Sequence, residues 1–101
     1  MKLITDIPSD WKDTSLLFVA LGDEHRQRIL LAFEPGERMN ILQIVAASTL
    51  SRSAVTHHLK VLRDSGALVS EKVGKAVYFS INRALIEDRL TRVLQYVAAQ
   101  T

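Results

Sequence analysis

Two short helical patterns follow each other along residues 40–66 with a link of only two residues between them. The first covers 41–48, where apolar residues recur at helical spacing and Asn40 can cap the helix. The second covers 51–65, with Ser51 as its cap and Gly66 as a left-handed terminator. A short helix, a tight turn and a second helix in this order predict a helix-turn-helix unit over 40–66.

The sequence pattern changes from helical to strand-like directly after this unit. Residues 68–73 and 76–81 are rich in Val, Tyr, Phe and Ile and are joined around Gly74, which is typical of a β-hairpin. Lys72 and Lys75 lie near its tip. A hairpin that follows a helix-turn-helix is the order of a winged helix, so we expect residues 68–81 to form the wing.

The remaining segments read as helices. Asp10 is the expected cap of a helix over 10–21, Asp23 caps another that runs through about Glu34, and Asn82 caps a last helix over 82–98. Because 101 residues leave room for one core, we expect a single winged helix-turn-helix domain over 1–101. Its class is mainly α (α+β), with four helices, two strands and a final helix.

The predicted helix 51–65 has two chemically different faces. Three apolar residues, Val55, Leu59 and Leu62, fall within about 60° of one another at 100° per residue. The other side carries hydroxyls, an imidazole and one cation instead of the Glu and Lys usual on a solvated face. Such groups read base edges and phosphates. This side comprises Ser53, Thr56, His57, Lys60 and Asp64, with Arg52 and Arg63 on its flanks.

The charge is divided unevenly along the chain. Residues 1–50 hold five Lys and Arg against seven Asp and Glu, whereas residues 51–101 hold eight against four. A basic half that contains the two-faced helix and the hairpin points to an anionic partner.

Several classes of protein lack support in this sequence. The chain has no cysteine, which removes disulfides, thiolate metal sites and cysteine nucleophiles. None of the four glycines forms a phosphate-binding loop. Ser51, Ser53 and His57 are explained by a helix cap and an exposed face, so we expect that the protein is not an enzyme. The longest apolar stretch, 16–21, is too short for a membrane span, and we expect a soluble, cytoplasmic protein.

Residues 50–69 and the segment upstream of them resemble a known family. The run LSRSAVTHHLKVLRDSGALV, residues 50–69, resembles the recognition-helix signature of the ArsR/SmtB family of bacterial transcriptional repressors. Upstream, Leu21, Gly22 and Asp23 with Arg26 are similar to the family's second-helix motif, except that Glu24 stands where proline commonly follows the aspartate. The resemblance covers about residues 15–97.

The resemblance implies a homodimer, paired through its first and last helices, that binds an operator in double-stranded DNA. It acts there as a repressor, or as an anti-repressor that competes for the same operator. A hydrophobic content of 48% agrees with a second copy as partner. The implied DNA contacts are Ser51, Arg52, Ser53, Thr56, His57, Lys60, Lys72 and Lys75, and His58 points to the buried side. The expected dimer contacts are Leu16, Leu17, Ile86, Leu90, Val93, Leu94 and Val97, and Trp11 and Tyr96 meet in the same region.

Many relatives of this kind release DNA when metal binds cysteines on the third helix or His, Asp and Glu on the last. Here the third helix has neither thiol nor imidazole, and the last has only the adjacent Glu87 and Asp88, which point about 100° apart. We therefore expect no metal site and no cofactor, and the inducer is unknown. The alternative from another class is a winged helix that binds protein and not DNA.

Overall fold

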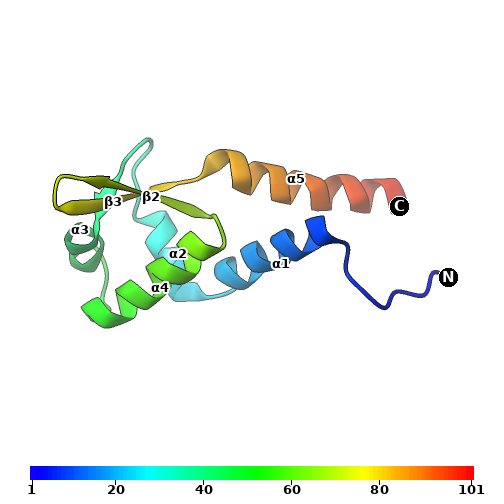
Figure 1. Cartoon of the computed structure of the whole chain (residues 1–101), viewed down its shortest axis with the longest axis horizontal. Helices are drawn as coiled ribbons and strands as arrows, with labels where there is room; N and C mark the ends of the chain where they lie inside the picture. Colours follow the sequence, from blue (N-terminus) through cyan, green and yellow to red (C-terminus); the bar gives the residue numbers. More distant parts are fainter.

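The computed structural model describes all 101 residues and has eight helices and strands (Figure 1). Its order confirms the predicted helices and hairpin and adds one strand before the third helix. The elements are α1 Ser9–Leu21, α2 Glu24–Leu31, β1 Met39–Asn40, α3 Ile41–Ala46, α4 Arg52–Asp64, β2 Leu68–Val73, β3 Ala76–Ile81 and α5 Arg83–Gln100.

Side-chain caps start four of the five helices at the predicted residues. Asp23, Asn40, Ser51 and Asn82 each accept a hydrogen bond from a backbone N–H in the first turn that follows. Asn40 forms a full capping box, because the side chain of Gln43 also accepts from the Asn40 N–H at 2.8 Å. These caps fix where α3 and α4 begin.

The predicted cap of the first helix was wrong. α1 begins at Ser9, with Pro8 in the cap position, and the Pro8 carbonyl accepts from the amides of Trp11 and Lys12 at 2.9 and 3.3 Å. Asp10 therefore lies inside the first turn, where its negative charge interacts favourably with the positive end of the helix dipole. Four ends also differ from expectation, since α2 stops at Leu31, α3 at Ala46, α4 at Asp64 and α5 at Gln100.

The hairpin has the expected boundaries and belongs to a three-stranded antiparallel sheet in the order β1-β3-β2. Strand β3 lies in the middle, with Phe79 opposite Met39 on one side and opposite Ser70 on the other. Strand β1 was missed because two residues are too few to show an alternating pattern. Its pairing ties the start of α3 to the base of the wing.

One core of buried apolar residues joins every element except α5, which packs Leu85 and Ile86 against its edge. It contains no residue of α5, although that helix is 18 residues long. α4 supplies the three residues predicted from its apolar face, all at most 2% exposed. The core residues are Leu17, Ala20, Ile29, Met39, Ile44, Val55, Leu59, Leu62, Ala67, Leu68 and Phe79.

Gly66 closes α4 in a left-handed conformation, as the sequence predicts, with φ of +84°. A Cβ at this position would lie 2.5 Å from Leu85 Cδ1. The turn after α4 therefore needs glycine both for its backbone angle and for the close approach of α5.

α1 and α5 lie side by side and antiparallel, and they extend away from the rest of the molecule (Figure 1). The two helices run along the longest dimension of the molecule, which is 52 Å, against 24 and 22 Å in the other directions. The rings of Trp11 and Tyr96 meet edge to face at 5.4 Å between centroids, and Arg92 donates to the Asp10 carbonyl at 3.0 Å. The predicted Trp11–Tyr96 contact thus exists within one chain. We call this pair of helices the arm.

Candidate nucleic-acid interface

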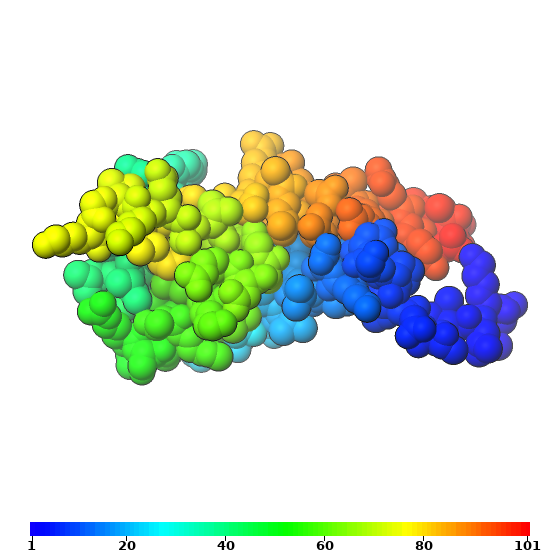
Figure 2. All heavy atoms as spheres, in the orientation of Figure 1, coloured from blue at the N-terminus to red at the C-terminus, as the bar shows by residue number.

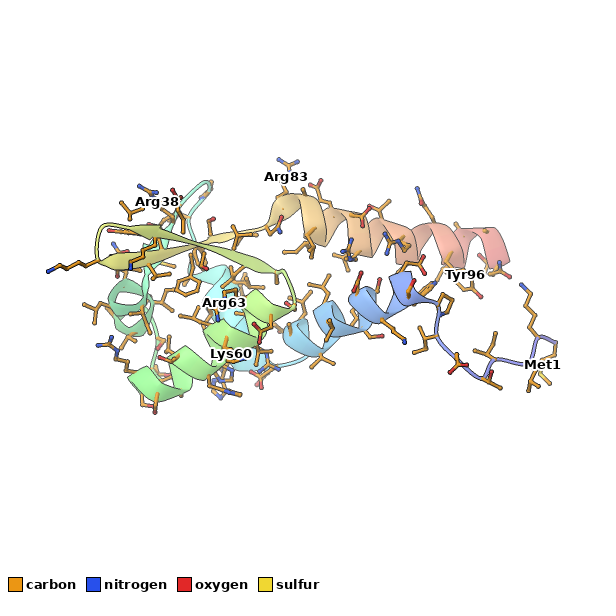
Figure 3. All side chains as sticks on the ribbon, viewed as in Figure 1. Met1, Arg38, Lys60, Arg63, Arg83 and Tyr96 are labelled. Carbon is orange, nitrogen blue, oxygen red and sulfur yellow. The ribbon has the colours of Figure 1, made fainter.

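The outward side of α4 is polar and open to solvent, as its sequence pattern predicts. Ser53, Thr56, His57 and Lys60 are all exposed, whereas the opposite side packs into the core. Figure 3 shows Lys60 and Arg63 on this helix. No other element covers this side, so α4 presents a continuous polar face about 20 Å long, at 1.5 Å per residue.

Hydroxyl groups at the start of α4 are held in place by short-range hydrogen bonds. Ser51 Oγ accepts from the Ala54 N–H at 3.2 Å and lies 3.2 Å from Ser53 Oγ. Thr56 Oγ1 donates to the Arg52 carbonyl at 2.9 Å, which leaves its lone pairs free to accept. The first turn has no acidic residue, so its positive end and Arg52 reinforce each other.

Lys60 is not free within the chain. Its Nζ lies 2.7 Å from Asp64 Oδ2, one helical turn later. The hydrogen bond from Lys60 lowers the pKa of the Asp64 carboxyl below its ordinary value, and Asp64 stays charged near neutral pH. Both side chains are more than half exposed, and such surface pairs are worth about 0–1 kcal/mol, so an anion can compete for Lys60 at low cost.

The hairpin carries the expected cations in exposed positions. Lys72 lies opposite Val77 in the ladder and Lys75 lies in the turn at the tip. Figure 2 shows this tip projecting from the end of the molecule opposite the arm. Both lysines are exposed and neither forms an ion pair.

Sequence reasoning missed one cation next to the hairpin. Arg38 precedes β1, and its guanidinium lies 5.1 Å from the centre of the Tyr78 ring and 3.5 Å from Glu71 Oε2 (Figure 3). A strand at 39–40 would have signalled this position, because pairing with β3 brings Arg38 to the wing.

His58 lies on the inner side of α4, as expected, and it bonds to a side chain of α2. Arg26 Nη1 lies 3.2 Å from His58 Nδ1. Because a guanidinium can only donate, Nδ1 accepts, which requires a neutral ring with its proton on Nε2. The same arginine donates to the carbonyls of Ala20 at 2.7 Å and Val19 at 3.1 Å. Arg26 thus joins the end of α1 to α4.

The charge environment of His58 favours this neutral form. Burial lowers its pKa below the ordinary 6.5, and the nearby Arg26, His57 and His25 lower it further, while Asp23 opposes them. The His58 ring centre lies 5.3 Å from that of His57 and 5.7 Å from that of His25. No group of three or more His, Cys, Asp or Glu residues is arranged to hold a metal ion.

The arm exposes apolar side chains on both of its helices. Of the predicted contacts, Leu16, Leu90, Leu94 and Val97 are exposed by 37 to 69%, whereas Val93 and Ile86 are partly buried. Leu17 is fully buried in the core of its own chain. Phe18 and Val19, on the same helix, are exposed by 46 and 65%.

Taken together, a helical core, a helix-turn-helix and an antiparallel wing define a winged helix-turn-helix protein. Residues 23–70 match the family model described as "Bacterial regulatory protein, arsR family". Over these residues the chain is similar to this arsR family, which supports a DNA-binding transcriptional regulator. No helix in it is long and apolar enough to cross a membrane.

Individual relatives agree with this family. Transcriptional repressor SdpR of Bacillus subtilis (strain 168) is 25% identical over 80% of this chain and 89% of its own length. A transcriptional repressor SmtB homolog of Synechocystis sp. is 36% identical, but the match spans 63% of this chain and only 48% of that protein. The ArsR-like transcriptional regulator from Rhodococcus sp. RHA1 has the same fold, with a TM-score of 0.81, 25% identity and coverage of 92% of this chain and 86% of that one.

Proposed function

We propose that this chain represses transcription by binding an operator in double-stranded DNA as a homodimer. The observation that carries the proposal is the uncovered polar face of α4, next to a hairpin with two unpaired lysines. The named repressors among its relatives support the direction of regulation. A regulator of this kind works where the chromosome is, so we place it in the cytoplasm.

In this proposal α4 enters the major groove. Ser53, Thr56 and His57 face base edges, because hydroxyls and a ring nitrogen can both donate and accept. Arg52 and Lys60 reach bases or phosphates, and Ser51 contacts the backbone at the end of the helix. The wing lysines, Lys72 and Lys75, contact phosphates or the minor groove.

The arm supplies the dimer interface. α5 has 18 residues, none of them buried, and a two-helix layer with apolar groups on both helices requires another layer against it. A second copy provides that layer with twofold symmetry. The contacts we propose are Leu16, Phe18, Leu90, Val93, Leu94 and Val97. Two α4 helices then meet half-sites about 34–36 Å apart.

We propose further that the inducer is not a metal. The donor set does not fit one, because the chain has no cysteine and no convergent group of three ligands. Glu87 and Asp88, the adjacent carboxylates of α5, form ion pairs with Arg83 and Arg92.

The test of DNA binding is a titration of the protein into its own promoter-region duplex and into a scrambled duplex, at two salt concentrations. The titration is repeated with zinc and with a chelator. We expect selective, salt-dependent binding that neither zinc nor chelator changes. Binding with neither selectivity nor salt dependence would favour a protein-interaction module instead.

Single substitutions test the assignment of α4. Arg52→Ala and Lys60→Ala should each weaken operator binding and flatten the plot of log affinity against log salt by about one unit. The matched control is Arg83→Ala, which removes the same charge at the start of α5, away from α4 (Figure 3). Equal losses in all three variants would show a net-charge effect and remove α4 from the interface.

A second pair of substitutions tests the arm. Leu90→Glu or Val93→Glu should split the dimer and abolish operator binding, because two charges would be buried in the interface. The control is Leu31→Glu on α2, which is 82% exposed and lies outside the arm. Sedimentation that still shows a dimer for Leu90→Glu would exclude α5 from the interface.

A further inference from the structure

A cavity of about 280 Å³ lies where α2, α3 and the turn before α4 meet. Its inner wall is apolar and includes Ile29 and Ile44, which are 2 and 1% exposed, together with Leu50. Its rim is polar and includes Arg28, His25 and Thr49, all three exposed. The cavity is separate from the polar face of α4 and from the arm.

The chemistry of the rim is that of an anion site. None of the lining residues is acidic. The Arg28 guanidinium has no ion pair and no side-chain hydrogen bond in the chain, so its forked donors are free. A carboxylate matches this fork with two parallel hydrogen bonds, and His25 has an N–H to donate in either protonation state.

The size and the inner wall restrict the rest of the ligand. Ligand pockets usually span about 300–1,000 Å³ and are mostly apolar with a few polar groups that orient the ligand. A cavity of about 280 Å³ therefore suits a single ring or a short chain. We propose that this cavity binds a small organic anion, with its apolar body against Ile29 and Ile44 and its carboxylate on Arg28.

The position of the cavity couples it to α4, a step that rests on the proposed function. One wall is the turn 48–50, in which Ser48 Oγ donates to the Val45 carbonyl at 3.3 Å and accepts from the Leu50 N–H at 3.1 Å. This turn sets the angle between α3 and α4. A ligand that fits one angle better than another shifts the population of the DNA-binding arrangement.

The test uses the full chain without DNA, followed by NMR of its backbone amides. Benzoate is the probe, and benzamide is the neutral molecule of the same shape. We expect saturable shifts at residues 47–50 with benzoate, and binding weaker by about tenfold with benzamide or in Arg28→Gln, because each loses a charge-assisted pair. Arg63→Gln, on α4 and outside the cavity, should bind benzoate like the parent chain.

Three results would overturn the proposal: no saturable shifts, equal binding of benzoate and benzamide, or equal losses in Arg28→Gln and Arg63→Gln. Reduced DNA affinity of Arg28→Gln with no benzoate response in the parent chain would make Arg28 a phosphate contact only. In a separate experiment, saturating benzoate should change operator affinity at least about threefold, and unchanged affinity would refute the coupling between the cavity and α4. Because ligand binding is measured without DNA, its failure is distinct from failure of the repressor proposal.

Discussion

Arg26 connects three helices, and replacing it by Gln should destabilise the protein strongly. Its guanidinium donates to the carbonyls of Ala20 and Val19, in the last turn of α1, and to His58 on α4. The last four carbonyls of a helix have no partner within the helix, and α1 has no basic residue of its own in that turn. Arg26 therefore supplies a donor to the Ala20 carbonyl and a second donor to the Val19 carbonyl, which also accepts from the Gly22 N–H at 3.3 Å, and its charge is favoured at the negative helix end.

The magnitude follows from this count of three partners. Hydrogen bonds with a charged member contribute about 1.5–3 kcal/mol each when buried, and Arg26 is only partly buried. A glutamine can keep one of the three, so we expect Arg26→Gln to lower the free energy of unfolding by about 2–4 kcal/mol. A domain of this size has about 5–15 kcal/mol in total, which makes this loss large.

The assay is equilibrium unfolding in urea at one fixed protein concentration, since dimerisation makes stability depend on concentration. The matched control is Arg28→Gln, the same change two residues later at an exposed side chain without hydrogen bonds, where we expect a change within about 0.5 kcal/mol. Gln27→Ala, which removes one neutral bond of 2.7 Å to the Leu21 carbonyl, should cost about 0.5–1.5 kcal/mol. If Arg26→Gln costs no more than Arg28→Gln, the connection is not stabilising and the reasoning fails.

Three further predictions concern pH, backbone and charge. Burial lowers the pKa of His58 in the folded state, so below the ordinary pKa of 6.5 the unfolded chain binds more protons than the folded chain, and the free energy of unfolding should fall as pH decreases from about 6.5 and be flat above it. If the His58→Gln variant shows the same dependence on pH as the parent chain, this prediction is refuted. Gly66 and Gly74 both have positive φ, but only Gly66 has a neighbouring side chain within 4 Å of the position that a Cβ would take, so Gly66→Ala should cost more stability than Gly74→Ala, for which we expect a loss of about 1 kcal/mol. Equal losses of stability in thermal unfolding would contradict the packing argument. Asp64→Asn should raise DNA affinity a few-fold by freeing Lys60 and removing a negative charge, and unchanged affinity in a binding titration would place Lys60 away from phosphate.

The sequence predicted the features that depend on local rules. Asn40, Ser51 and Asn82 start their helices because each needs only an N–H two or three residues ahead, and such signals are complete within one turn. The hairpin 68–81 was found with its boundaries because strand residues and a turn glycine occur in an unbroken run. The polar face of α4 followed from helical period alone.

The features it did not predict depend on contacts between distant segments. Met39 joins the sheet only because β3 is there to pair with it. Leu17 and Leu16 look alike in the sequence, and which of them is buried depends on how α1 rotates against α4 and α2. The bond from Arg26 to His58 spans 32 residues, and no local pattern indicates it. The contribution of each residue to the dimer stays a prediction for the same reason.

These long-range contacts also explain how the arm can affect α4, although α5 lies outside the core. α1 packs against α5 on one side and against α2 and α4 on the other. Leu17 and Ala20 bury α1 in the core, and Arg26 fixes its last turn to His58 on the inner side of α4. A rotation of the arm at a dimer interface therefore has to move α4 or break this connection. Loss of the bond to His58 should for this reason weaken DNA binding more than its cost in stability accounts for, because the two α4 helices of a dimer would no longer be held at a fixed spacing.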